Sequence, residues 1–299
     1  MKEQLYILEN IENFEPKHIF ECGQCFRWNK DEDESYTGVV GNNVLNVKKE
    51  KNNIIIKGVF GDNIQDICRR YFDLETDYNP IKEKLSNIDI NLRTSIEYGK
   101  GIRILKQDVW ETLISFIISA NNNIPRIKGI IEKISKKYGK EIEWNNTKYY
   151  TFPTPEELSK ANIKDLRLLG LGFRDSRVFE TTQIINNKEV DLEKLEQTEN
   201  IGVLREELLK FPGVGPKVAD CIMLFSMKKH EVFPIDVWVK RVMTELYYNE
   251  LIECKKVKDL KGEMIPEIKN QKILELAENK FGKLAGIAQQ YLFYWRREN

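Results

Sequence analysis

Residues 208–221 read LLKFPGVGPKVADC, and residues 234–237 read PIDV. An apolar helical turn leads into Pro212, two glycines one residue apart predict a tight turn, and Pro216 suits the first position of a second helix. The stretch therefore predicts a helix-hairpin-helix. We expect its glycines to take backbone angles that turn N–H groups outward. Together with the positive end of the second helix, these groups would bind an anion such as a DNA phosphate.

Two residues in these stretches are not needed for a hairpin. Lys217 puts a cation in the first turn of a helix, where the macrodipole disfavours it. The same field favours the neutral amine that a nucleophile requires. Asp236 follows Pro234-Ile235 and precedes an amphipathic run, so we expect it to cap the N-terminus of a helix. Both residues are candidate catalytic groups.

The motifs PGVGPKVADC and PID resemble those of the helix-hairpin-helix, Gly/Pro-Asp superfamily of DNA base-excision glycosylases. Within it, the chain most resembles the 8-oxoguanine DNA glycosylase/AP lyases, over nearly its whole length. The resemblance implies that Lys217 attacks C1′ to form a Schiff base and that Asp236 stabilises the developing charge. The enzyme would excise 8-oxoguanine paired with cytosine and nick the strand by β-elimination. In the hairpin, Gly213, Gly215 and Val218 would contact DNA.

Two alternatives stay open. The nearer one is a glycosylase of the same superfamily for another lesion, such as an oxidised pyrimidine or an alkylated purine. The other is a non-catalytic hairpin that only binds DNA, although such a hairpin would need neither Lys217 nor Asp236.

Length and composition indicate an ordinary globular protein. The 299 residues are 41% hydrophobic, enough for sizeable cores and about two domains. Because 47 basic residues balance 47 acidic ones, DNA affinity has to come from local basic segments. The chain has no signal-peptide pattern and no apolar run long enough to span a bilayer. We therefore expect an intracellular monomer, in the cytoplasm or nucleoid, with no membrane partner.

The cysteines predict neither disulfides nor a metal. There are five, an odd number, and they are scattered along the chain. Cys22 and Cys25 have a metal-like spacing, but no second pair follows. Superfamily members of the endonuclease III type carry a four-cysteine iron-sulfur loop near the carboxyl end, whereas here only Cys254 lies beyond the catalytic segment. We expect no iron-sulfur cluster and no other cofactor.

The first hundred residues differ from the rest. Short segments rich in valine and isoleucine at 36–40, 44–48 and 53–59, separated by Asn and Gly turns, predict an antiparallel meander. Residues 64–72 and 80–92 look helical, and from Lys106 helical periodicity takes over. The prediction is an α+β fold, with an N-terminal antiparallel-sheet domain (1–100) and a mainly helical, two-lobed domain (101–299).

Ahead of the meander, residues 22–28 read CGQCFRW and resemble the GQxFRW segment of the oxoguanine glycosylases. There the glycine carbonyl accepts a hydrogen bond from N7–H, which 8-oxoguanine has and guanine lacks. A buried carbonyl facing the bare N7 of guanine would be unpaired and repelled. The resemblance thus makes Gly23 a lesion-reading residue. The alternative is that Gly23 only serves the turn into a strand.

An apolar helical pattern from Val109 to Ile118 ends in Ser-Ala-Asn-Asn-Asn. The segment resembles the family's SxNNN[IL]xR element, which enters the duplex from the minor groove. By resemblance, Asn121 fills the space left by the flipped base and Arg126 reads the orphaned cytosine. An ordinary Asn-rich helix stop is the plainer alternative.

A second DNA-facing element is predicted at residues 169–174, LGLGFR. The glycines just before it, Gly170 and Gly172, expose Phe173, which is suited to wedging between bases, while Arg174 would supply a cation to the orphan base or the backbone. Alternatively, Phe173 plugs a helix junction.

The last helix completes the predicted base pocket. Gln289 and Phe293 are four residues apart and share a helix face. By resemblance, the glutamine reads the Watson–Crick edge of the lesion, Phe293 stacks on the base and Cys221 contacts its other side. Phe293 and Cys221 could equally be core residues. Trp238 departs from the family, many of whose animal members have a phosphate-contacting histidine there.

Overall fold

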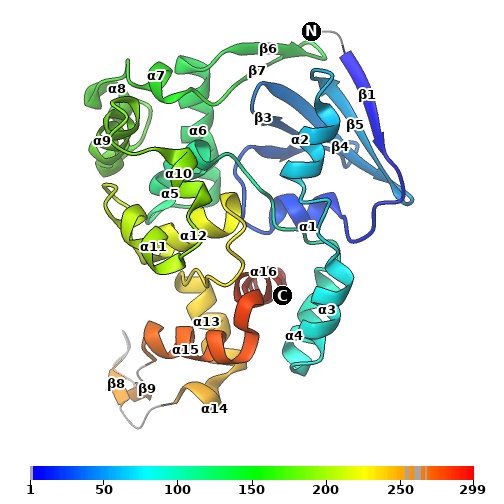
Figure 1. The fold of residues 1–299 in the computed structure, drawn as a ribbon, viewed down its shortest axis with the longest axis vertical. Helices are drawn as coiled ribbons and strands as arrows, with labels where there is room; N and C mark the ends of the chain where they lie inside the picture. Colours follow the sequence, from blue (N-terminus) through cyan, green and yellow to red (C-terminus); the bar gives the residue numbers. More distant parts are fainter. Residues whose placement is uncertain (1–2, 253–255, 259–263, 267) are drawn as a thin grey trace. The chain divides into compact units, whose positions relative to one another are not determined.

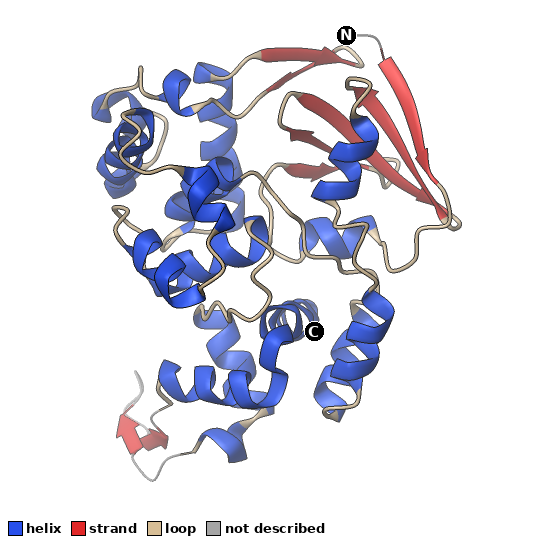
Figure 2. Cartoon of the chain, viewed as in Figure 1, coloured by secondary structure: helices blue, strands red, loops and turns tan. Residues whose placement is uncertain are grey.

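The protein has an α+β fold in which an antiparallel sheet precedes a mainly helical remainder (Figure 2), as predicted. The computed structural model describes residues 3–252, 256–258, 264–266 and 268–299. Cys254, on which part of the iron-sulfur prediction rests, lies outside these residues.

Contacts divide the chain into two compact units. Unit 1 comprises Met1–Thr76 and Gly101–Lys228, and unit 2 comprises Asp77–Lys100 and Lys229–Asn299. Each unit is therefore built from two separate stretches of sequence. The domain boundary predicted near residue 100 stays a prediction.

The sheet of unit 1 has five antiparallel strands in the order β1-β5-β4-β3-β2 (Figure 1). Its strands are β1 Glu3–Leu8, β2 Trp28–Lys30, β3 Tyr36–Val40, β4 Asn43–Glu50 and β5 Asn53–Val59. The predicted meander, β3 to β5, is confirmed. Strands β1 and β2 were not predicted: β2 is only three residues long, and β1 joins the sheet through the distant strand β5.

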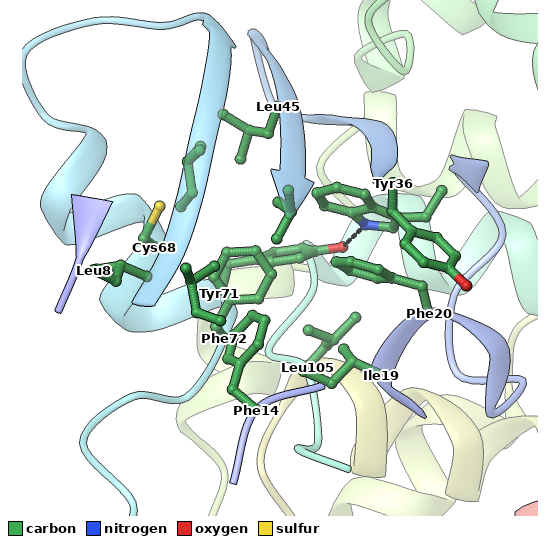
Figure 3. Packing of buried hydrophobic residues seen from close by; sticks show 14 of the residues in the cluster. Leu8, Phe14, Ile19, Phe20, Tyr36, Leu45, Cys68, Tyr71, Phe72 and Leu105 are labelled. Atoms are coloured by element: carbon green, nitrogen blue, oxygen red, sulfur yellow. Dashed lines mark hydrogen bonds between the residues drawn. The ribbon is translucent and has the colours of Figure 1, made fainter. Parts of the chain in front are cut away.

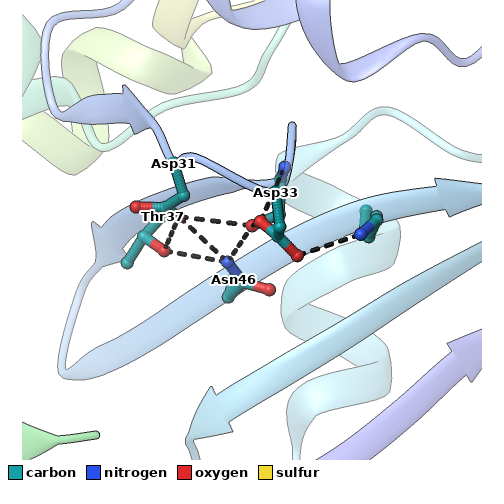
Figure 4. Close-up of polar contacts among 6 residues, drawn as sticks. Asp31, Asp33, Thr37 and Asn46 are labelled. Atoms are coloured by element: carbon teal, nitrogen blue, oxygen red, sulfur yellow. Dashed lines mark hydrogen bonds and ion pairs between the residues drawn. The ribbon is translucent and has the colours of Figure 1, made fainter.

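A polar network holds the acidic turn between β2 and β3 (Figure 4). Asp31 Oδ2 accepts hydrogen bonds from Thr37 Oγ1 at 2.6 Å and from Asn46 Nδ2 at 3.1 Å. Asp33 accepts one from Lys48 Nζ at 2.9 Å. These carboxylates therefore stabilise the hairpin.

One face of the sheet packs on α1 (Pro16–Glu21) and α2 (Ile64–Tyr71), forming the main core of unit 1 (Figure 3). The Trp28 ring stacks on Phe20 with centroids 3.9 Å apart, and its Nε1 donates to the Tyr71 hydroxyl at 2.8 Å. A Cβ at position 38 would lie 2.5 Å from the Trp28 ring, so glycine is required at this close approach. The GQCFRW segment is thus anchored through its tryptophan.

The other face of the sheet contacts a small hairpin formed by β6 (Glu141–Trp144) and β7 (Thr147–Tyr150). Val44 and Val59 pack there against Ile142. This hairpin was not predicted, and it sits between helices in the chain.

The helices of unit 1 carry most of the candidate site. They are α5 Val109–Ser119, α6 Ile124–Tyr138, α7 Pro155–Leu158, α8 Ile163–Leu168, the 3-10 helix η1 Gly172–Arg174, α9 Asp175–Asn186, α10 Leu192–Gln197, α11 Ile201–Leu209 and α12 Pro216–Ser226. Helix α5 is buried along nearly its whole length, and most of its residues are apolar.

Unit 2 is mainly helical. Its elements are α3 Tyr78–Ser86, α4 Ile90–Tyr98, α13 Val237–Leu246, α14 Tyr248–Leu251, β8 Lys256–Lys258, β9 Met264–Pro266, α15 Asn270–Phe281, the 3-10 helix η2 Gly282–Leu284 and α16 Ala285–Glu298. The single helix predicted for residues 80–92 is wrong. Asp89 has extended backbone angles and its carboxylate accepts from Leu92 N–H, so it caps a new helix.

Candidate active site

Helices α11 and α12 form the predicted helix-hairpin-helix. Arg205 on α11 donates two hydrogen bonds, of 3.0 and 2.8 Å, to Oδ1 of Asp220 on α12. Burial raises the pKa of the Asp220 carboxyl, while the neighbouring Arg205 acts in the opposite direction. This ion pair fixes the two helices to each other.

The two hairpin glycines differ in conformation. Gly213 has φ +85°, a left-handed value that favours glycine. Gly215 has φ −100° and ψ 180°, angles that any residue adopts, so its conformation alone does not require glycine. In the part of the chain that the structure describes, no atom lies within 4 Å of the position of a Cβ at Gly215. Glycine there leaves the backbone open to close approach from outside the chain.

The N-terminus of α12 has hydrogen-bond donors to offer. Gly215 is its N-cap and has no side chain to accept from the first turn, whose N–H groups have no intrahelical acceptor. Val218 lies in this turn with its side chain buried. A phosphate oxygen is the kind of group that such a helix end binds.

Lys217 is half-buried in the same turn. Its Nζ lies 5.1 Å from the ring centroid of Phe116 on α5. The Phe116 ring also stacks on Phe225 of α12, at 5.6 Å, and meets Phe26 edge to face, at 5.3 Å. The amine is therefore held over an apolar aromatic wall. Phe116 was missed in the sequence because it looks like any other core position of α5.

Phe26 belongs to the GQCFRW segment, so Phe116 brings that segment and Lys217 together. Gly23 has φ +82°, which explains the need for glycine in this turn. Cys25 is fully buried, and burial raises the pKa of its thiol. Arg27 Nη1 lies 3.8 Å from Oε2 of Glu111, whose pKa burial raises to about 7.

The three asparagines after α5 have different places. Asn123 caps α6 by accepting from Arg126 N–H at 3.0 Å, and Asn122 donates to the Ile118 carbonyl at 3.1 Å. A helix stop therefore accounts for these two. Asn121 is exposed and has φ +51°, which asparagine tolerates. Its predicted entry into the duplex stays a prediction.

Arg174 is buried and holds this turn. Its guanidinium donates to the carbonyls of Ala120, at 2.8 and 2.6 Å, and Asn121, at 2.6 Å. A fourth bond, at 3.2 Å, reaches the Leu171 carbonyl. Burial lowers the pKa of the guanidinium, and the nearby Arg126 and Arg177 add to the effect. This geometry favours an indirect role for Arg174, through the turn that carries Asn121.

Phe173 and Arg126 are both exposed beside that turn. The Phe173 side chain is 53% exposed, so it does not plug a helix junction. The guanidinium carbons of Arg174 and Arg177 lie 4.2 and 5.1 Å from its ring centroid. Arg126 donates to the Gly170 carbonyl at 3.2 Å. An exposed aromatic ring among arginines is a surface suited to nucleic acid.

Unit 2 carries the other candidates. Asp236 caps α13 as predicted, its Oδ1 accepting from Val239 N–H at 2.7 Å. Trp238 is 47% exposed, with the Arg241 guanidinium carbon 5.2 Å from its ring. The aspartate thus borders an exposed aromatic and cationic surface.

The predicted base pocket residues are mostly buried. On α16, Gln289 is buried and its Oε1 accepts from Gln290 Nε2 at 2.9 Å, while Phe293 is half-buried with Arg297 5.5 Å from its ring. Cys221 is buried on α12 in unit 1. Their predicted contacts with the base stay predictions.

Within the described residues, no three His, Cys, Asp or Glu side chains are arranged to hold a metal ion. Among the same residues, no helix has the length and hydropathy to cross a membrane.

The hairpin and its lysine, together with the sheet that precedes them in the sequence, indicate a class of protein, the base excision DNA repair proteins. The model of the HhH-GPD superfamily of such proteins matches residues 114–267, and that of the 8-oxoguanine DNA glycosylase N-terminal domain matches residues 6–113. The chain belongs to the 8-oxoguanine DNA glycosylase/AP lyase family of this superfamily.

Relatives are similar to this protein in sequence and structure along most of the chain. It is 32% identical to the N-glycosylase/DNA lyase of Saccharomyces cerevisiae, over 92% of this chain and 81% of the yeast protein. It is 44% identical to the 8-oxoguanine glycosylase/lyase of Clostridium acetobutylicum. The apo structure of that protein superimposes with a TM-score of 0.88, covering 98% of both chains. Its complex with double-stranded DNA containing cytosine opposite 8-oxoguanine gives 0.90, covering 100% of this chain and 97% of that one.

Proposed function

We propose that this chain excises 8-oxoguanine paired with cytosine from duplex DNA and then nicks the strand. The observation that carries the proposal is the shared aromatic contact of Phe116. Its ring lies under the Lys217 amine and against Phe26, three residues from Gly23. The candidate nucleophile therefore lies against the same aromatic cluster as the segment that carries Gly23, in a chain of the family that performs this reaction.

The chemistry begins with the flipped-out lesion nucleotide. Flipping costs less at a damaged pair, which contributes to selectivity. The Lys217 nitrogen bonds to C1′ as the bond from C1′ to the base breaks, and the proton that the attacking amine loses neutralises the departing base. Asp236 stabilises the oxocarbenium-like charge that develops on the sugar. Its carboxylate is oriented by the hydrogen bond from Val239.

Strand cleavage follows from the covalent intermediate. The sugar ring opens when the bond from C1′ to the ring oxygen breaks, and the remaining amine proton passes to that oxygen, which leaves the imine between Lys217 and C1′. The imine makes the C2′ proton acidic, so its removal expels the 3′ phosphate by β-elimination. An amine nucleophile needs no metal, nucleotide or redox cofactor for these steps.

Recognition is divided among three groups of residues. Gly23 accepts from N7–H, Gln289 reads the Watson–Crick edge of the lesion, and Phe293 and Cys221 contact its two faces. Asn121 and Phe173 enter the duplex, and Arg126 reads the orphaned cytosine. The N–H groups of the hairpin, around Gly213, Gly215 and Val218, bind phosphate.

The enzyme works as a monomer, without an iron-sulfur cluster. A single chain supplies both the nucleophile and the carboxylate, which supports the monomer. Because its substrate is duplex DNA, we place the enzyme with the DNA, in the cytoplasm or nucleoid.

Borohydride trapping tests the proposal. Native protein, an 8-oxoguanine duplex and sodium borohydride should give a covalent protein–DNA species, because reduction converts the imine to a stable amine. Lys217→Gln should give none and should still bind the duplex. The matched control is Lys210→Gln, in the same hairpin, where the native lysine is exposed and pairs with Glu207 at 2.6 Å. It should trap like the native protein.

Each contrary result has a definite meaning. Trapping by Lys217→Gln at the native level would identify another amine as the nucleophile. Base release by native protein without any trapped species would mean that water attacks, and would assign the chain to the monofunctional glycosylases. Excision of other lesions with none of 8-oxoguanine would refute the proposed substrate.

A further inference from the structure

Gln24, next to Gly23, is completely buried, and both the nitrogen and the oxygen of its side-chain amide form hydrogen bonds. Nε2 donates to the carbonyls of Ile19 and Arg103, each at 2.9 Å. Oε1 accepts from Leu105 N–H at 2.8 Å. One uncharged side chain therefore joins the end of α1 to the segment leading into α5.

This anchoring acts on the Gly23 carbonyl. Gly23 has no side chain and a left-handed φ, so nothing of its own holds the turn. Its carbonyl lies in the planar peptide that it shares with the Gln24 nitrogen and Cα. Because Gln24 is held in place, the peptide plane has little freedom to rotate, and the Gly23 carbonyl keeps its direction.

A second glutamine continues the connection. Gln107 Nε2 donates to the Gln24 carbonyl at 2.7 Å, and Gln107 N–H donates to the Phe225 carbonyl at 2.9 Å. Phe225 lies in the last turn of α12, whose carbonyls have no intrahelical donors. Gln107 thus links the main chain at the Gln24 carbonyl, one peptide beyond the Gly23 carbonyl, to the helix that carries Lys217.

We infer that Gln24 and Gln107 are positioning residues for lesion recognition, which fix the Gly23 carbonyl with respect to α12. The inference rests on the proposed function, in which this carbonyl accepts from N7–H. A hydrogen bond weakens steeply when its acceptor moves out of line. Loosening the peptide should therefore weaken recognition of the base. Binding of the DNA backbone should persist, because the hairpin N–H groups do not depend on either glutamine.

Binding measurements in the Lys217→Gln protein separate these effects, because that variant leaves the lesion in place. Dissociation constants are measured for three duplexes that differ at one nucleotide opposite cytosine: 8-oxoguanine, guanine and a tetrahydrofuran abasic analogue. Gln107→Ala and Gln24→Ala are added in turn. The control is Gln65→Ala, which changes an exposed glutamine on α2. Thermal unfolding of each protein shows that it is folded.

Gln107→Ala should weaken binding of the 8-oxoguanine duplex roughly tenfold, about the value of one hydrogen bond. The dissociation constants for the abasic and guanine duplexes, which offer no N7–H, should change by less than about twofold. A change of that size is within the effect of an ordinary surface substitution. Gln24→Ala should act in the same direction and more strongly. Gln65→Ala should leave all three dissociation constants unchanged.

The positioning role would be overturned if Gln107→Ala weakened binding of all three duplexes equally or changed the binding of none. This test does not depend on whether Gln24→Ala folds. A different result bears on the proposed function itself. If the Lys217→Gln protein binds the guanine and 8-oxoguanine duplexes equally, no carbonyl reads the lesion, and the proposed role of Gly23 in recognition fails together with the positioning role.

Discussion

Arg174 offers a direct test of how the asparagine turn is held. Its guanidinium is buried, and four hydrogen bonds connect it to the carbonyls of Ala120, Asn121 and Leu171. Arg174→Ala removes all four, while Arg174→Lys keeps the charge but loses the planar fork that reaches several carbonyls at once.

The cost follows from these contacts. A hydrogen bond from a charged donor contributes about 1.5–3 kcal/mol. Water can replace the donor at exposed Asn121 but not at the buried Leu171 carbonyl. We therefore expect Arg174→Ala to lower the free energy of unfolding by roughly 2–4 kcal/mol and Arg174→Lys by roughly half of that.

Urea unfolding followed by circular dichroism measures the loss, with Arg126→Ala as an exposed control expected within about 0.5 kcal/mol of native. A second readout is the salt dependence of DNA binding. Loss of a phosphate contact lowers the slope of log K against log salt by about one. An Arg174→Ala protein with native stability and a slope reduced by about one would refute the holding role and establish direct contact.

Three further outcomes are expected. Asp236→Asn should bind lesion duplex like the native protein but excise more slowly, because the charge acts mainly on the transition state; native excision rates would remove Asp236 from the mechanism. Arg126→Ala should reduce the preference for cytosine over adenine opposite the lesion, and an unchanged excision ratio would contradict its assignment. Because the pKa of Glu111 is raised to about 7 in the folded protein, its contribution to stability is present at low pH and lost as pH rises through 7. Glu111→Gln should therefore gain stability relative to native between pH 5 and 8, by up to roughly 3 kcal/mol in urea unfolding, whereas a pH-independent difference would contradict the shift.

The sequence predicted the features that depend on neighbouring residues. The hairpin follows from Pro212, Gly213 and Pro216, and the cap of α13 from Asp236, because turns and caps are set within a few residues. The meander followed from short segments rich in valine and isoleucine between Asn and Gly turns.

The features it missed depend on distant residues. Gln24 bonds to Leu105, 81 positions away, and Arg174 to Ala120, 54 away. Nothing local distinguishes Gln24 from a surface glutamine, Arg174 from an exposed arginine or Phe116 from any apolar position of α5. Their partners become neighbours only when the chain folds, so a periodic pattern cannot identify them.

The division of unit 2 into two stretches of sequence bears on how the protein is made. Tyr98 at the end of α4 contacts Tyr294 of α16, with ring centroids 5.5 Å apart. The ribosome releases α4 long before α16, with the whole Gly101–Lys228 segment of unit 1 translated between them. Unit 2 therefore completes its core only when the last helix is released, after the sequence of unit 1 is available to fold. A nascent chain would carry the hairpin and Lys217 before unit 2 had folded around Asp236, Gln289 and Phe293.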